Sequence, residues 1–195
     1  MLVEVAELNG SAGNKDFWAK SRAAEAAILE TISRLVQRPI VPNTQTGAHC
    51  YDFVTSHNTV GDIKIWSGSD LTVELEQFRN GRRWPGWFSV YLEDTGFAGL
   101  ITANARYSNY HNREVFKVRW INWPSLINWV FKHNESIKTN SRGSYIKINP
   151  TFVKHIYIGD YFAVPSKYGA GFKAFDTSKI YCNNNLDIKE LQQYF

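Results

Sequence analysis

Two short segments that alternate apolar and polar residues constrain the fold most strongly. They lie within GDIKIWSGSDLTVELEQ, residues 61–77, on either side of a turn rich in serine and glycine. Because successive side chains of a strand point to opposite faces, each segment is typical of a β-strand with one apolar and one polar face. The polar face of the two strands carries three carboxylates and an amine: Asp62, Lys64, Glu74 and Glu76.

If the two strands pair around the turn at Ser67–Asp70, these four polar groups converge, because paired side chains lie about 5 Å apart. Clustered carboxylates repel one another, and a hard divalent cation relieves that repulsion. Mg²⁺ prefers oxygen ligands and is often bound by one or two carboxylates plus a substrate phosphate. The pattern therefore favours a Mg²⁺ site, in which Mn²⁺ may substitute, suited to phosphodiester hydrolysis. A solvated sheet face is the alternative interpretation.

A helix is predicted from Asp16 to about Gln37, where Pro39 ends it. Its apolar residues recur at helical spacing and form one stripe. Glu25 lies inside this stripe, so we expect it to be buried and to face the same cavity as Glu74. An acid on a buried face is costly unless another group pairs with it.

The rest of the chain reads mainly as strands. Strands are predicted over Ile40–Asn43, Tyr51–Thr55, Trp87–Leu92, Leu100–Ala103, Val115–Ile121, Tyr145–Ile148 and His155–Val164. Short helices are expected from Pro124 and over Asp187–Gln193. A helix followed by a β-meander and a mixed remainder predicts an α/β or α+β fold, in a single domain over residues 1–195.

The acidic residues resemble the motif of the PD-(D/E)xK nuclease superfamily. The family pattern is an acid on one strand, a turn, and an acid-x-lysine motif on the next strand, and an earlier helix often carries a glutamate. The resemblance covers residues 16–104 and implies a restriction-endonuclease-like core, with a central mixed sheet flanked by helices. Asp62 and Glu74 resemble the metal-binding acids and Glu25 the helix glutamate. Glu76 stands where lysine is usual, although some restriction endonucleases have Glu or Gln there.

A second register of the same motif uses Asp52, ten residues before Asp62-Ile63-Lys64. It retains the lysine in its expected position but leaves Glu74 and Glu76 without a role. We prefer Asp62/Glu74/Glu76 on this ground. Asp62 belongs to both registers.

Basic residues suggest an anionic partner. The formal charge is +4, and the sequence pI is about 9.0. Six cationic residues are candidates for contact with a nucleic-acid backbone: Arg79, Arg82, Arg83, Arg106, Arg113 and Lys117. The sequence thus predicts a Mg²⁺-dependent endonuclease of restriction type acting on DNA, and cleavage of both strands would favour a homodimer. A non-catalytic nucleic-acid-binding protein and a β-rich module that binds protein or sugar stay open as alternatives.

Other site classes find no support in the sequence. The two cysteines, Cys50 and Cys182, show no CxxC spacing, so a zinc site built on cysteine is not expected. The first residues carry Glu4 and Glu7 and do not resemble a signal peptide. No apolar run approaches the roughly 20 residues of a membrane span. A cytoplasmic protein is expected.

Overall fold

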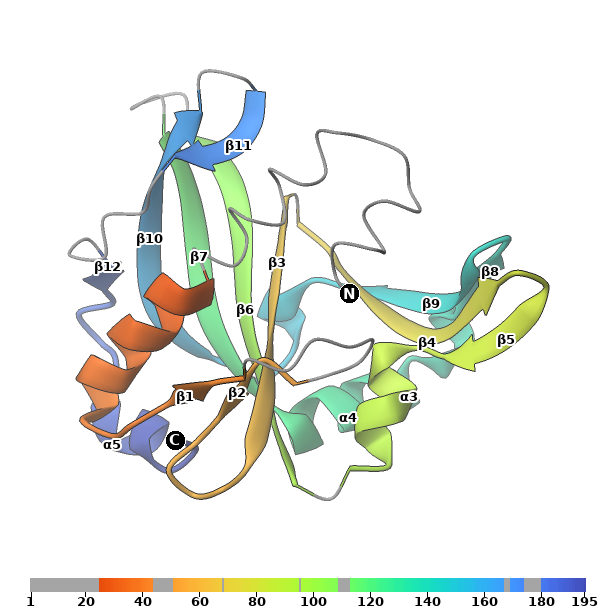
Figure 1. Cartoon of the computed structure of the whole chain (residues 1–195), viewed down its shortest axis with the longest axis horizontal. Helices are drawn as coiled ribbons and strands as arrows, with labels where there is room; N and C mark the ends of the chain where they lie inside the picture. The colour runs from red at the N-terminus through yellow and green to blue at the C-terminus, as the bar shows by residue number, and fades with distance from the viewer. Residues whose placement is uncertain are drawn as a thin grey trace.

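The strands form two sheets. The computed structural model describes residues 25–43, 51–67, 69–94, 96–108, 113–166, 169–173 and 180–195. The main sheet is mixed, with strand order β1-β2-β3-β6-β7-β10-β11 and β12 beside β10 (Figure 1). A smaller antiparallel sheet has the order β5-β4-β9-β8 and projects away from the main sheet (Figure 1). This is a mixed α+β fold with a mixed central sheet, as the sequence predicts at that level.

The strands have the following bounds. In the main sheet they are β1 (Val41–Pro42), β2 (Phe53–Val54), β3 (Val60–Ser67), β6 (Phe97–Ser108), β7 (Arg113–Asn122), β10 (Ile156–Ser166), β11 (Gly169–Lys173) and β12 (Ile180–Cys182). In the smaller sheet they are β4 (Leu71–Arg79), β5 (Arg82–Pro85), β8 (Lys138–Asn140) and β9 (Gly143–Ile148). The pair β3–β6 is parallel, and the other described pairs are antiparallel.

One face of the main sheet packs against a helix over residues 25–36. Its buried residues Ile28 and Ile32 join Ile63 of β3 in one apolar cluster. The helix ends where the sequence predicts, because Gln37 adopts a left-handed conformation with φ of 53°. The amide groups of Gln37 and Arg38 then bond back to the carbonyl groups of Arg34 and Ser33 and satisfy the end of the helix. The predicted start at Asp16 lies outside the described residues.

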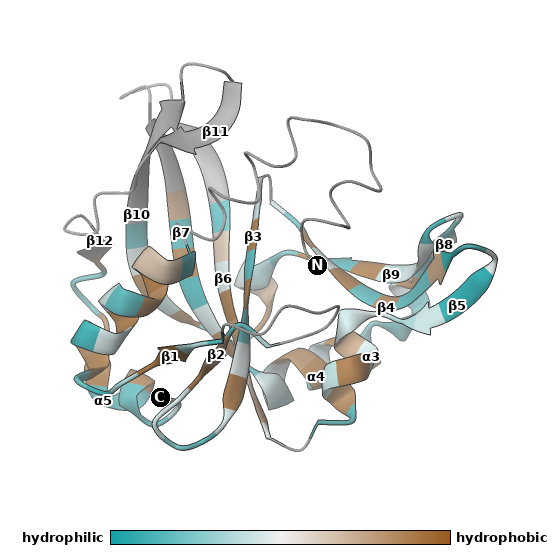
Figure 2. Cartoon of the chain, viewed as in Figure 1, coloured by the Kyte–Doolittle hydropathy of each residue, from teal (hydrophilic) through white to brown (hydrophobic). Residues whose placement is uncertain are grey.

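The opposite face of the main sheet packs against α3 (Trp87–Leu92), α4 (Trp123–Lys132) and the inner face of the smaller sheet. Leu100 of β6, Val73 of β4 and Leu126 of α4 share this second apolar cluster. Apolar and polar residues are mixed along the helices and the strands of the main sheet, whereas most of β5 is hydrophilic (Figure 2). Because both faces of β3 are covered, Asp62 is 2% exposed, and the side chain of Lys64 is 26% exposed.

Two expectations about secondary structure and pairing are wrong. Residues Trp87–Leu92 form the helix α3 rather than a strand, and its buried residues Trp87, Phe88 and Tyr91 have helical spacing. Tertiary packing here outweighs the strand preference of aromatic and β-branched residues. In addition, β3 and β4 do not pair around Ser67–Asp70, because the chain passes there from the main sheet to the smaller one.

The remaining predicted elements are confirmed with shifted ends. The strands β6, β7, β9 and β10 cover the predicted segments, and α4 begins at Trp123, capped by the side chain of Asn122. The last helix, α5 (Ile188–Gln192), is capped by Asp187. Among the described helices, none has the length and apolar character to cross a membrane.

Candidate active site

The hairpin of β2 and β3 places Asp52 beside Asp62. Phe53 is paired with Gly61, so Asp52 directly precedes the two-residue strand β2. Its backbone amide donates to the Gly61 carbonyl (2.8 Å), and its Oδ2 accepts from the Ile63 amide (2.7 Å). The Asp52 carboxylate therefore accepts a hydrogen bond from β3 that the backbone of a longer β2 would otherwise accept. This bond fixes the carboxylate against β3.

Asp62 and Lys64 follow each other on one face of β3. Lys64 Nζ lies 2.5 Å from Asp62 Oδ2 and 5.0 Å from the centre of the Trp87 ring in α3. Asp62 Oδ2 is buried, and apart from this ammonium no amide, hydroxyl or ring N–H of the described residues donates to it. A buried carboxylate oxygen with so few partners is costly, which is typical of a site that binds a further group.

Burial and the neighbouring Asp62 shift the pKa of Asp52. Burial, followed by repulsion from Asp62 and the hydrogen bond that the protonated form donates to Asp62, raises the pKa of Asp52 well above its usual range. Glu25 raises it further, and Lys64 opposes the shift. Two neighbouring carboxyl groups are also two sets of oxygen ligands for one hard cation.

The amine of Lys64 remains charged. Burial alone would lower its pKa, but attraction from Asp62 and Asp52 outweighs burial and holds the pKa of Lys64 above its usual range. Glu74 adds a smaller contribution in the same direction. At neutral pH the residue is therefore an ammonium group that can hold an anion or a water molecule, and it is no proton acceptor.

Glu25 is half-buried rather than fully buried as expected. It lies in the first turn of the described part of the helix, and its charge acts on Asp52. The helix thus brings a third carboxylate toward the pair of aspartates.

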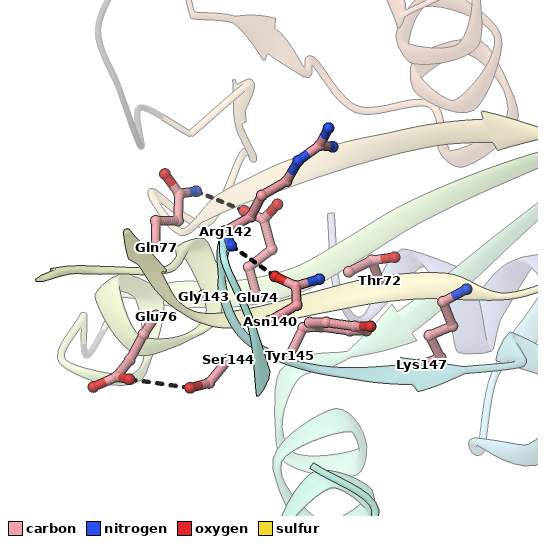
Figure 3. Close-up of a pocket in the computed structure, with 10 residues that line it drawn as sticks. All are labelled: Thr72, Glu74, Glu76, Gln77, Asn140, Arg142, Gly143, Ser144, Tyr145 and Lys147. Carbon is pink, nitrogen blue, oxygen red and sulfur yellow. Dashed lines mark hydrogen bonds between the residues drawn. The ribbon is translucent and has the colours of Figure 1, made fainter. Parts of the chain in front are cut away.

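Glu74 and Glu76 lie in the other sheet and point to opposite faces of it. A β-bulge between them adds one residue to β4, so the period-2 alternation breaks. Glu74 accepts from Gln77 Nε2 (2.6 Å), whereas Glu76 accepts from Ser144 Oγ (3.1 Å) on the opposite side (Figure 3). The expectation that both glutamates share a face and converge with Asp62 and Lys64 is wrong. Of these two glutamates, Glu74 contributes to the pKa shift of Lys64.

Three of the five arginines predicted to bind nucleic acid are exposed in the hairpin of β4 and β5. Arg83 lies 4.0 Å from Glu76 and over the ring of Phe78. Arg79 and Arg82 are paired with each other across the hairpin. Lys117 of β7 forms an ion pair with Asp160 (3.0 Å). The backbones of Arg106 and Arg113 lie in β6 and β7, but their side chains fall outside the described residues.

Arg119 is not among the six cationic candidates taken from the sequence, although it belongs to this region. It is 7% exposed, and its Nη1 donates to Asn104 Oδ1 (2.8 Å). Lys64 is paired with Thr102, and Thr102 is paired with Arg119. Arg119 therefore lies on the same face of the sheet as Lys64 and Asp62. The sequence indicates a polar position here, because two cations interrupt a buried strand. Lys117 and Arg119 alternate with Phe116, Val118 and Trp120.

The donor set at the aspartates fits a hard divalent cation. Among the described residues, no three His, Cys, Asp or Glu side chains are grouped as a complete metal cage. Mg²⁺ does not require one, since it commonly takes one or two carboxylates and keeps several waters. Asp52 and Asp62 supply two carboxylates on neighbouring segments of the β2–β3 hairpin, and Asp62 Oδ2 forms the ion pair with Lys64.

Comparisons with models of protein families, with curated proteins and with solved structures each found no match to this chain.

Proposed function

We propose that the protein is a metal-dependent nuclease whose active site is formed by Asp52, Asp62 and Lys64, with Glu25 beside them. The observation that supports this most strongly is the paired carboxyl groups of Asp52 and Asp62, with Lys64 Nζ 2.5 Å from Asp62. The geometry supports the second register of the motif rather than the preferred first one.

The order of elements also favours a restriction-endonuclease-like core. The helix over residues 25–36 precedes β2, and a short turn joins β2 to β3. An acid before β2, an acid-x-lysine motif on β3 and a glutamate on the earlier helix follow the family pattern. In this arrangement Glu74 and Glu76 are not metal-binding residues.

Asp52 and Asp62 would hold a Mg²⁺ or Mn²⁺ ion. Such an ion, when bound, lowers the pKa of a coordinated water and offsets the charge of a phosphate group. Asp52 must release its proton for this, because metal ligands are deprotonated.

Lys64 has a separate role as a fixed cation. Its charged ammonium, positioned by Asp62 and by the Trp87 ring, would hold the attacking water or a phosphate oxygen. It would also stabilise the negative charge that develops on the phosphate in the transition state. Glu25, half-buried next to Asp52, would accept a hydrogen bond from water at the edge of the site.

The test is cleavage of supercoiled plasmid and of labelled short DNA duplexes by the purified protein. We expect nicked or cut products with Mg²⁺ or Mn²⁺ and none with excess chelator. The Asp62→Asn variant should be inactive at saturating metal while its thermal unfolding stays cooperative. Absence of cleavage by folded protein with either metal, on DNA or RNA, contradicts the proposal and leaves non-catalytic nucleic-acid binding as the alternative.

A further inference from the structure

We infer that the outer face of the smaller sheet binds an unpaired strand of nucleic acid and leads it to the aspartates. This outer face is defined by Arg82 and Trp84 of β5, Tyr145 and Lys147 of β9, Lys138 of β8, and Arg142 in the turn between β8 and β9. The inference deepens the proposed function and rests on it for the identity of the substrate.

The register shows that these side chains share one face. Gln77 is paired with Trp84 and Arg79 with Arg82, while Glu74 is paired with Tyr145. The side chains of Glu74 and Gln77 are hydrogen-bonded to each other, so they lie on the same face of the sheet. Their paired residues Tyr145 and Trp84 lie on that face too. Figure 3 shows Arg142 and Lys147 on this side of the sheet, with Glu76 and Ser144 on the other. The inner side carries Val73 and Ile146, which are packed in the second apolar cluster.

The face is hollow, cationic and aromatic. A cavity of about 290 Å³ opens on it; Arg142, Tyr145 and Lys147 line it, and the acidic residues Glu74 and Glu76 line it as well. Arg82, Lys138, Arg142 and Lys147 are all exposed, and Trp84 is 51% exposed. Trp84 lies on the side of the sheet away from the apolar cluster, so part of its ring surface is open to a ligand.

This combination fits an unpaired strand better than a duplex. Bases of a single strand stack on aromatic side chains, and nearby cations contact the phosphates. A duplex keeps its bases stacked on one another, so it offers its backbone and base edges but no open base face to an aromatic ring. With strands about 4.8 Å apart and a rise of about 3.3 Å per residue, Trp84 and Tyr145 lie roughly 12 Å apart. That separation lets them contact different bases of one strand.

The face is continuous with the candidate active site. Glu74 lies in its inner half, held by Gln77, and its charge acts on Lys64. Arg82 and Arg142 lie at the two hairpin tips, whereas Lys147, paired with Thr72, lies beyond Glu74 toward the start of β4. The tips themselves are joined by a hydrogen bond from the Phe78 amide to the Arg142 carbonyl (2.8 Å). A strand bound along the face would thus pass from the tips toward Asp62.

The test is equilibrium binding of a fluorescent 15-residue oligo-dT to the full-length protein in chelator, where no cleavage competes. We expect Trp84→Ala to weaken binding about fivefold or more, since stacking on one aromatic contributes on the order of 1 kcal/mol or more. Trp84→Phe should restore most of the affinity. The pair Arg142→Ala and Lys147→Ala should reduce the slope of log affinity against log salt by about 1.4.

Matched controls lie elsewhere on the chain. Phe131→Ala removes an aromatic of α4 that is 58% exposed, and Lys189→Ala removes an exposed cation of α5, so both should bind oligo-dT like the unchanged protein. If Trp84→Ala and the double variant also bind like the unchanged protein, the inference is wrong. Equal loss of affinity for a blunt duplex on Trp84→Ala also overturns it, because stacking on an unpaired base is then not involved. Binding that follows the prediction without any metal-dependent cleavage supports the inference and refutes the proposed nuclease.

Discussion

Replacement of Gly61 by alanine should destabilise the fold next to the active site. A Cβ atom at this position would lie 2.2 Å from Cζ of Phe53 and under 3.0 Å from two further ring atoms. Phe53 is fully buried and stacks on Phe195 with ring centres 6.0 Å apart, so the ring has no free space to enter. The clash therefore has to be relieved by a shift of β2 away from β3.

The size of the effect follows from this geometry. Overpacking of a well-packed core costs about 1–3 kcal/mol. In a chain of this length, 1 kcal/mol corresponds to about 2–4 °C in the melting temperature. At about 2 kcal/mol we expect Gly61→Ala to melt about 4–8 °C below the unchanged protein. Because the Gly61 carbonyl accepts the Asp52 amide, the affinity for Mn²⁺ should fall as well.

The assay is thermal unfolding followed by circular dichroism, together with calorimetric titration of Mn²⁺. In a Phe53→Leu background the clashing ring atoms are absent, so Gly61→Ala should cost less than it does alone. Gly96→Ala serves as a matched control, because its nearest neighbour would be an Asp94 oxygen at 3.3 Å in an exposed turn. A melting temperature of Gly61→Ala within about 1 °C of the unchanged protein, with unaltered Mn²⁺ affinity, would refute this reasoning.

Two further predictions concern the charges of the site. The pKa of Asp52 is raised in the folded protein, so its favourable contribution is present below the unfolded value of about 3.9 and is lost as pH rises through the folded pKa. The Asp52→Asn variant should therefore have a higher melting temperature than the unchanged protein at pH 7 in chelator. Near pH 3.5 its melting temperature should show no such increase. An equal increase at both pH values contradicts the assignment. Lys64→Met should raise Mn²⁺ affinity, because the ammonium no longer competes for the carboxylates, and should lower the cleavage rate about 100-fold. Calorimetry measures the first effect and a cleavage assay the second. Weaker metal binding by this variant would contradict the account.

Local patterns predicted most elements but not how they pair. The alternation in residues 61–77 correctly indicates two strands, because each has one face toward an apolar cluster. The Ser67–Asp70 turn resembles a hairpin turn, yet β3 is paired with β2 and β6 while β4 is paired with β5 and β9. Periodicity reports which residues share a face of one strand and carries no information about the partner strand.

The candidate site was predicted in part for the same reason. Asp62, Lys64 and Asp52 were all identified, but the preferred register rested on Glu74 and Glu76 sharing a face. The bulge in β4 adds a single residue, which no alternation pattern distinguishes from a regular strand. Asp52 gains its position from a side-chain bond to the Ile63 amide, a tertiary contact that lies beyond sequence spacing.

Single-turnover cleavage by Asp52→Asn and Glu76→Gln, measured side by side with saturating Mg²⁺, tests the central claim most directly. Asp52→Asn removes one of the two proposed metal ligands, and the rate should fall at least about 100-fold. Glu76→Gln keeps an acceptor for Ser144 on the opposite face of the smaller sheet, and it should cleave within about threefold of the unchanged protein. An inactive Glu76→Gln variant beside an Asp52→Asn variant of nearly unchanged rate would contradict the assignment of the active site to Asp52, Asp62 and Lys64.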